Sequence, residues 1–139
     1  GAASCRCAAR DVAASEVIIA QAYGDPASAA DGAPIIWPTA QFDTHGAYSV
    51  STGRFTCPIS GYYRVSAVIT SAVAAREVYI NVNAVDTRLL GTTDSNGEGT
   101  FSSVVKAIAG DILDVRPDAG ALDVASGASV TFERIGGIQ

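Results

Sequence analysis

Histidine and long apolar runs are scarce in this chain of 139 residues, and each shortage excludes a class of function. His45 is the only histidine, so a nucleophilic relay would depend on it, with Asp43, Cys57 or a distant serine as its partner. Because His45 stands in a turn-like Asp-Thr-His-Gly segment, we interpret it as a solvated loop residue without a catalytic role. No apolar run approaches the roughly 20 residues that a membrane helix requires, so we expect no membrane insertion.

Basic residues are also few, and they are scattered singly along the chain. Nine Lys and Arg residues against fourteen Asp and Glu residues give a formal net charge of −5. Such a chain repels nucleic acid, and no cluster of basic residues offsets the repulsion, so we expect no nucleic-acid partner. The acids lie mostly singly in predicted turns, which does not favour the paired carboxylates of a glycoside hydrolase. We therefore expect no enzymatic activity.

The three cysteines, Cys5, Cys7 and Cys57, do not fit a pattern of paired disulfides or a common metal site. One of them stays unpaired in any monomer, and paired C-x-x-C spacings are missing, so free or interchain thiols are favoured over a metal site. Asp118 and Asp123 could supply oxygen ligands to calcium, but no ladder of ligands like that of an EF-hand accompanies them. We expect no cofactor, and calcium binding remains an open alternative.

Turn residues are abundant and regularly spaced. Gly, Pro, Asn and Asp recur at intervals of roughly ten residues, which is typical of an all-β sandwich or barrel. Between them, period-two alternation predicts strands, and in 62–70 it places one set of side chains inward: Tyr63, Val65, Ala67 and Ile69. The other predicted strands are 77–82, 101–108, 112–116 and 130–135. We expect 101–108 to be an interior strand, whereas the buried face of 130–135 stays open.

The N-terminal quarter is harder to interpret. Within 8–23, Val12, Glu16, Ile19 and Tyr23 would share one side of a helix, but the β-branched run at 17–19 favours a strand. We predict a strand there and a loop over 24–33. No internal repeat or shift in composition appears, so residues 1–139 are expected to form a single domain, with 1–33 as its N-terminal strand and loop.

Aromatic residues cluster around two turn signals, 51–53 and 58–61, near the middle of the chain. They are Phe42, Tyr48, Phe55, Tyr62 and Tyr63. This pattern is typical of β-hairpins with large side chains on a buried face. Gly53 and Gly61 allow the chain to reverse with positive φ.

The run FD, GAYS, STGRFTCP and GYY over 42–63 resembles the signature of the globular head of complement subcomponent q, a family with the tumour-necrosis-factor-like jelly roll. The resemblance continues through 78–83, through the Gly110-Asp111 connection and into 130–135. It implies an antiparallel jelly-roll β-sandwich that assembles as a homotrimer. Each strand of such a sandwich needs one apolar face, in agreement with the alternation described above.

The wording FDTHGAYS, GRFT and VTFERIGG looks closer to the bacteriophage and bacterial versions of this family, and no collagen-type Gly-X-Y stalk is present. The resemblance therefore implies a virion structural module, in a tail fibre, a head fibre or a capsid decoration. Its partners would be other virion proteins and a glycan or protein of the host surface. The alternative is a secreted or surface binding protein of a bacterium that uses the same trimeric module.

The most polar turn is the predicted hairpin tip at 92–99. Jelly rolls vary their loops on a rigid sandwich, so binding groups tend to lie on such tips. Asp94, Ser95, Asn96 and Glu98 offer two carboxylates, a hydroxyl and an amide, which can hydrogen-bond sugar hydroxyls. We predict these four residues as ligand-binding candidates, with a solvated loop that binds nothing as the alternative.

Overall fold

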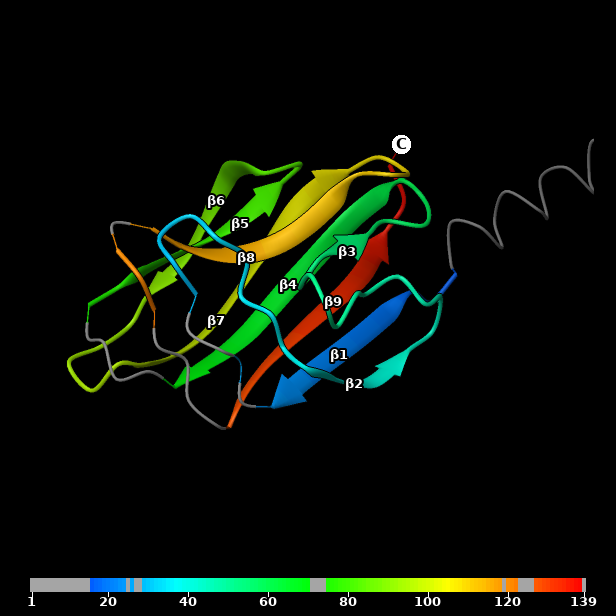
Figure 1. Cartoon of the computed structure of the whole chain (residues 1–139). Helices are drawn as coiled ribbons and strands as arrows, with labels where there is room; N and C mark the ends of the chain where they lie inside the picture. Colours follow the sequence, from blue (N-terminus) through cyan, green and yellow to red (C-terminus); the bar gives the residue numbers. More distant parts are fainter. Residues whose placement is uncertain are drawn as a thin grey trace, which may run out of the picture.

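The computed structural model describes residues 16–24, 26, 29–70, 75–118, 120–122 and 127–138, and its regular secondary structure there consists of β-strands. Nine strands form two antiparallel sheets that stack face to face (Figure 1). The strands are β1 (Ile19–Gly24), β2 (Thr39–Asp43), β3 (Phe55–Thr56), β4 (Gly61–Thr70), β5 (Glu77–Val82), β6 (Val85–Thr92), β7 (Glu98–Ala107), β8 (Ile112–Asp118) and β9 (Ala128–Gly136). The predicted all-β jelly-roll sandwich is confirmed.

The two sheets differ in size, and the larger one places the first and last strands side by side. One sheet has the strand order β2-β1-β9-β4-β7, and the other has the order β3-β8-β5-β6. The first and last strands are neighbours, with Ile19 opposite Glu133. Both ends of the described chain therefore leave from the same end of the sandwich, whereas the β6–β7 connection lies at the opposite end (Figure 1).

Strands β4 and β9 show the alternation that builds the core. The inward side chains of β4 are at most 2% exposed, and they are the four predicted ones: Tyr63, Val65, Ala67 and Ile69. On β9 the buried face consists of Ala128, Val130 and Phe132, which answers the question that the sequence left open. Antiparallel sheets with one apolar face in the core and one face outside produce this pattern.

Aromatic rings from several strands fill the core. Phe55 of β3 stacks on Phe132 of β9, with ring centroids 5.0 Å apart, and it meets Tyr63 of β4 edge-on at 5.8 Å. Tyr48 packs against Phe132, and its hydroxyl donates to the Trp37 carbonyl and accepts from the Trp37 N–H, both at 3.0 Å. The closely spaced aromatics of the sequence thus join the two sheets into one core.

Two aromatic residues of that segment lie outside this core. Phe42 is 41% exposed on β2, which is an edge strand, so the expectation of a buried side chain is wrong for this residue. Tyr62 is 38% exposed, as the alternation along β4 requires when its neighbour Tyr63 is buried. The difference arises because spacing around turns does not specify which face of an edge strand is covered.

The prediction of an interior strand over 101–108 is also wrong. This segment belongs to β7, which is an edge strand of the five-stranded sheet. Its inward positions include the buried Val105 and Ala107, and its outward positions include Ser102 and Lys106, which are exposed. Because the half-buried Val104 is on the outward face, the strand has apolar residues on both faces. Interior strands have the same sequence pattern.

The N-terminal prediction of a strand is confirmed for residues 19–23, whereas the described residues 16–18 precede the strand. Of the strand expected over 8–23, the structure contains β1, and residues 8–15 lie outside the described residues. In the expected loop over 24–33, Ala29 forms an isolated bridge with Leu122, and residues 25, 27 and 28 are outside the described ranges. No helix in the described ranges is long and apolar enough to cross a membrane.

Candidate ligand-binding site

The predicted ligand loop connects β6 to β7, and the carboxylate of Asp94 shapes it. Asp94 Oδ1 accepts hydrogen bonds from the backbone N–H groups of Asn96 at 2.8 Å and Glu98 at 3.0 Å. The Asp94 N–H donates to the Glu98 carbonyl, and the Gly97 N–H donates to the Asp94 carbonyl. Gly97 has a φ of 79°, which glycine adopts without strain. One oxygen of Asp94 therefore maintains the turn, in addition to any role toward a ligand.

The base of the loop is tied to the chain that leads into β5. Thr93 is 3% exposed, its N–H donates to the Arg76 carbonyl at 2.9 Å, and its hydroxyl accepts from the Arg76 N–H at 2.8 Å. The Ala75 N–H donates to the Asp94 carbonyl at 3.2 Å. These bonds hold the loop against a segment 17 residues away in the sequence. The candidate loop is thus fixed at its base, and its tip is exposed.

An open depression of about 370 Å³ lies beside the loop, where β4 ends and β7 begins. Its lining residues are Val68, Ile69, Thr70, Asp94, Glu98, Gly99 and Thr100. The structure therefore brings Asp94 and Glu98 together, whereas Ser95 and Asn96 are exposed but do not line the depression. Carboxylate and hydroxyl oxygens at such a site can accept hydrogen bonds from sugar hydroxyls, and the hydroxyls can also donate.

Thr70 and Thr100 are the lining residues that sequence reasoning missed. Each occupies an outward position on its strand, and both add hydroxyl groups to the depression. The available signal was their place at the ends of the two strands that flank the polar loop. Their position at the strand ends identifies them as lining residues only when the strand pairing is known, with Val68 opposite Thr100 and Thr70 opposite Glu98.

His45 is an exposed loop residue, as predicted. Its Nε2 lies 3.3 Å from Glu16 Oε1, and its Nδ1 lies 2.7 Å from the Thr44 hydroxyl. The carboxylate of Asp43, one of the considered relay partners, accepts from the backbone N–H groups of Ala47 at 3.0 Å and Tyr48 at 2.8 Å. Asp43 therefore maintains a turn, and its carboxylate is not among the groups that contact the His45 ring.

The other residues considered for chemistry are separated or lie outside the described ranges. Cys57 is a free cysteine with 1% exposure, and burial, followed by the charge of Asp111, raises the pKa of its thiol to about 12. Cys5, Cys7 and Asp123 are not among the described residues. Within the residues that are described, no group of three or more His, Cys, Asp or Glu side chains could hold a metal ion.

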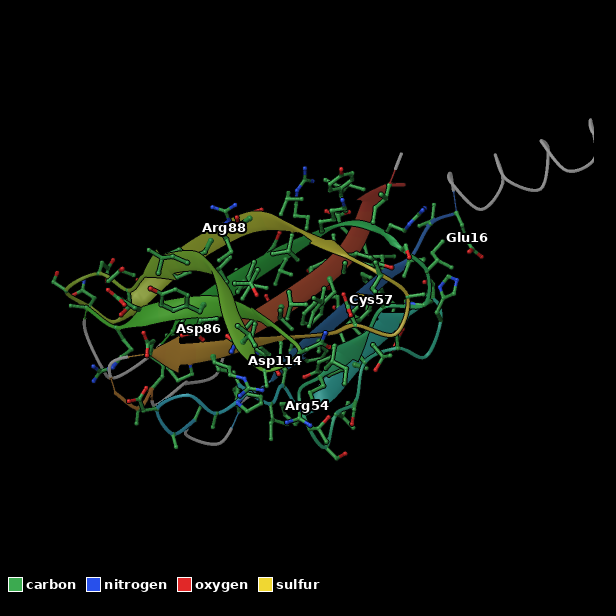
Figure 2. The ribbon with its side chains drawn as sticks, turned by 90° about the horizontal axis from the view of Figure 1, so that it is seen from above. Glu16, Arg54, Cys57, Asp86, Arg88 and Asp114 are labelled. Atoms are coloured by element: carbon green, nitrogen blue, oxygen red, sulfur yellow. The ribbon has the colours of Figure 1, made fainter. Side chains whose placement is uncertain are left out.

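A second polar arrangement, on the four-stranded sheet, was not predicted. The carboxylate of Asp114 on β8 is 1% exposed and is held by Arg116, with Arg54 close by. Figure 2 shows Arg54 beside Asp114. The sequence signal was a charged pair, Asp114 and Arg116, at positions of β8 that alternate with the inward-facing Leu113 and Val115.

Residues 18–116 match the C1q domain family. The globular domain of zebrafish complement 1qA protein is similar in structure, with 16% identity and a TM-score of 0.60 over 84% of this chain and 93% of that chain. Eiger TNF from S. frugiperda has 16% identity and a TM-score of 0.64 over 88% and 95%. Murine APRIL has 11% identity and a TM-score of 0.58 over 86% and 100%. No curated protein matches the sequence.

Proposed function

Because the chain belongs to the C1q domain family, we propose that residues 1–139 form one non-enzymatic jelly-roll module of a homotrimeric virion protein. C1q domains are generally binding or structural modules. The module would serve in a bacteriophage tail fibre, a head fibre or a capsid decoration, in contact with other virion proteins. The observation that carries this proposal is the outer face of the five-stranded sheet, which has the composition of an association surface.

This outer face combines half-exposed apolar side chains with small hydroxyl side chains. Four large side chains on it are 38–44% exposed: Tyr23, Phe42, Tyr62 and Val68. Between them, the Ser66 hydroxyl donates to the Ser102 hydroxyl at 3.3 Å across β4 and β7. The face also carries Arg64 and Glu133, which pair with each other, and aromatic residues of the kind that are enriched in interfaces. Three copies around an axis would each contribute this face to a closed assembly.

Recognition of a host glycan or protein is proposed for the β6–β7 loop and its depression. The loop lies at the opposite end of the sandwich from both ends of the described chain, so a neighbouring part of the polypeptide need not cover it. Asp94 and Glu98 reach the depression, and Ser95 and Asn96 stand at the exposed tip. This set of groups supports hydrogen bonding to sugar hydroxyls.

The virion context rests on the resemblance of 42–67 and 130–137 to bacteriophage versions of the family. The alternative, a secreted or surface binding protein of a bacterium, would use the same trimer and the same loop. Detection of the chain in purified phage particles by mass spectrometry would support the first context. Recovery of the chain only from a bacterial surface or culture medium would support the second and overturn the first.

The trimer is tested by adding one charge to the proposed association face. Light scattering of the unmodified chain is expected to give three times its mass of 14.1 kDa. Ser66→Arg, near the middle of the face, is expected to give the monomer mass, because a buried unpaired charge is costly. Thr87→Arg, exposed on β6 of the other sheet, is the matched control and should remain trimeric.

A monomer mass for the unmodified chain at micromolar concentration would contradict the trimer. A trimer mass for Ser66→Arg would show that a different surface makes the contacts. Circular dichroism of each variant checks that the strands are retained.

The loop is tested by changing its free side chains while Asp94 is kept. The triple variant Ser95→Ala, Asn96→Ala and Glu98→Gln retains the Asp94 bonds to the backbone of the turn. We expect an unchanged melting temperature, because exposed substitutions usually cost within about 0.5 kcal/mol. We also expect loss of binding on a glycan array. Unaltered glycan binding by this variant would remove the loop from consideration.

A further inference from the structure

A narrow cleft opens on the four-stranded sheet, beside the tip of the β5–β6 hairpin. Its volume is about 250 Å³. Its lining residues are Arg54, Asn83, Ala84, Ile112, Asp114 and Arg116. They come from the residue before β3, from the hairpin tip and from β8. Because Phe55 pairs with Leu113 and both point into the core, Arg54 and Asp114 lie together on the outer face. The cleft is smaller than the roughly 300–1,000 Å³ of pockets for drug-sized ligands, so it fits one small chemical group.

The floor of the cleft is a fixed ion pair. Arg116 Nε and Nη2 donate to the two oxygens of Asp114 at 2.8 and 2.9 Å, and Arg116 Nη1 donates to the Gly32 carbonyl at 3.0 Å. The Asp114 side chain is 1% exposed and that of Arg116 is 11% exposed. Hydrogen bonding to Asp114 raises the pKa of Arg116. Asp114 therefore has its charge matched by Arg116 alone and does not need a second cation.

The Arg54 side chain lies next to this ion pair and makes no hydrogen bond to it. Its Nε lies 3.8 Å from Asp114 Oδ2, which is beyond hydrogen-bond distance, and its side chain is 47% exposed. Its backbone carbonyl accepts from the Ser49 N–H at 2.9 Å, and in the described part of the chain the side chain has no polar partner other than Asp114. Asp86 on β6 acts electrostatically on Arg116 but does not line the cleft (Figure 2). A guanidinium in this state offers its planar N–H groups to an incoming anion.

Two of the lining residues, Ala84 and Ile112, are apolar, and hydrogen bonds fix the hairpin tip that carries Ala84. Asn83 clamps the hairpin tip to β8, because its N–H donates to the Ile112 carbonyl at 2.8 Å and its Oδ1 accepts from the Ile112 N–H at 3.0 Å. Asn83 Nδ2 also donates to Asp111 Oδ1 at 3.0 Å. Ala84 has a φ of 65°, a conformation in which glycine would be unstrained. The two-residue connection between Val82 and Val85 requires positive φ at both of its residues, so the hairpin itself sets the geometry of the tip.

We propose that this cleft binds the carboxylate of an acidic sugar, with Arg54 as the anchoring residue. The carboxylate pairs with the Arg54 guanidinium, and the C–H face of the sugar ring lies against Ala84 and Ile112. A sugar fits better than a peptide terminus, because the apolar part of the lining consists of two small patches and offers no pocket for a peptide side chain. The inference rests on the proposed glycan-binding role, and it names an acidic ligand class and a site separate from the β6–β7 loop.

The test uses matched pairs of sugars that differ only in the carboxylate. Glucuronic acid and galacturonic acid, with glucose and galactose as their neutral partners, are titrated into the full chain, and NMR shifts of the cleft residues are followed. We expect the acids to shift Ile112 and Ala84 and the neutral sugars to shift neither. Arg54→Gln should weaken acid binding by about tenfold or more, and Arg54→Lys should weaken it less.

Arg88→Gln, an exposed arginine on β6 that does not line the cleft, is the matched control and should bind the acids as the unmodified chain does. A melting temperature retained in Arg54→Gln would show that Asp114 and Arg116 still hold the cleft. The proposal is overturned if the acids do not bind, if neutral sugars bind equally well, or if Arg54→Gln binds unchanged. A peptide with a free C-terminal carboxylate that binds in place of the acids would also overturn the sugar assignment.

Failure of this proposal is distinguishable from failure of the loop proposal. If acid binding is lost in the loop triple variant but retained in Arg54→Gln, the cleft proposal is overturned. The proposal that the protein binds glycans would still stand. The opposite result is acid binding that is lost in Arg54→Gln and unchanged in the loop triple variant. It would support the cleft as the binding site and would exclude the β6–β7 loop.

Discussion

The outer face of the four-stranded sheet carries arginines and aspartates, whereas that of the five-stranded sheet carries mainly hydroxyl and half-exposed apolar side chains. Each sheet needs only one apolar face for the core, so the fold leaves both outer faces free to differ. On the first face, Asp114 is buried and held by Arg116. On the second, the ion pair of Arg64 and Glu133 is 45% and 32% exposed. One sandwich thus supports a fixed polar cleft on one side and, on the other, a surface whose ion pair is partly exposed.

The comparison is tested most strongly at Asp114. Asp114→Ala leaves Arg116 nearly buried without its carboxylate, and breaking a buried pair in this way costs about 3–5 kcal/mol. Urea unfolding measures the loss. Asp86→Ala, exposed on β6 of the same sheet, is the control and should stay within about 0.5 kcal/mol. Equal losses for the two variants would show that the Asp114 pair contributes no more than a surface charge.

A second prediction concerns the inner faces, where the two sheets share one aromatic ring. A β-carbon on Gly91 of β6 or on Gly99 of β7 would overlap the ring of Phe101. Gly91→Ala and Gly99→Ala should therefore each lower the free energy of unfolding by about 1–3 kcal/mol through overpacking. Gly136→Ala, where a β-carbon meets nothing within 4 Å, is the control. Partial recovery in Gly91→Ala combined with Phe101→Leu would confirm the steric cause, and no recovery would argue against it.

The hairpin tip that borders the cleft offers a stabilising change. Ala84→Gly removes the strain of a φ of 65° and should raise the free energy of unfolding by about 1 kcal/mol in thermal or urea unfolding. Asn83→Gly, one residue earlier, is the contrasting variant. It should lower stability, because its side chain bonds to Asp111 and Ile112 are lost. A destabilised Ala84→Gly would show that the backbone at this position is not strained.

The smallest effect is expected on the other outer face. In the isolated protomer, a double-mutant cycle on Arg64 and Glu133, with Ala and Gln replacements, should give a coupling energy of about 0.2–1 kcal/mol, since both side chains are partly exposed. Added salt should reduce the coupling further. A larger coupling in the assembled chain would mean that a partner subunit covers and desolvates the pair, as the proposed association face predicts, and an equal coupling in both states would place the pair outside that interface.

The core strands were predictable because their side chains alternate strictly. The four inward residues of β4 follow from period two alone. Strand β6 was not assigned from the sequence, because Leu90 is the only buried residue in VDTRLLGT. Edge strands of this kind obtain their backbone partners from a neighbour and need no apolar face of their own. The edge position of β7 was missed for a related reason. Alternation of apolar and polar residues indicates which face of a strand is buried, but it does not indicate how many strands pair with it.

The candidate sites were less predictable, because their geometry depends on distant contacts. The polar character of the β6–β7 loop is visible in the sequence, but its attachment to Arg76 depends on the pairing of residues on separate segments. The cleft combines Arg54, the hairpin tip and β8, which lie up to 62 positions apart in the chain between Arg54 and Arg116. No local pattern marks such a set before the sheets are assembled.

The buried thiol of Cys57 makes local opening of the fold chemically measurable. Only the thiolate reacts with alkylating reagents, and burial raises the pKa of this thiol to about 12. At neutral pH, Cys57 should therefore react only when the region where β3 joins β8 opens to solvent. In a background with Cys5→Ser and Cys7→Ser, the alkylation rate gives the frequency of that opening. Comparison of this rate with global unfolding would show whether the sandwich separates at this edge first.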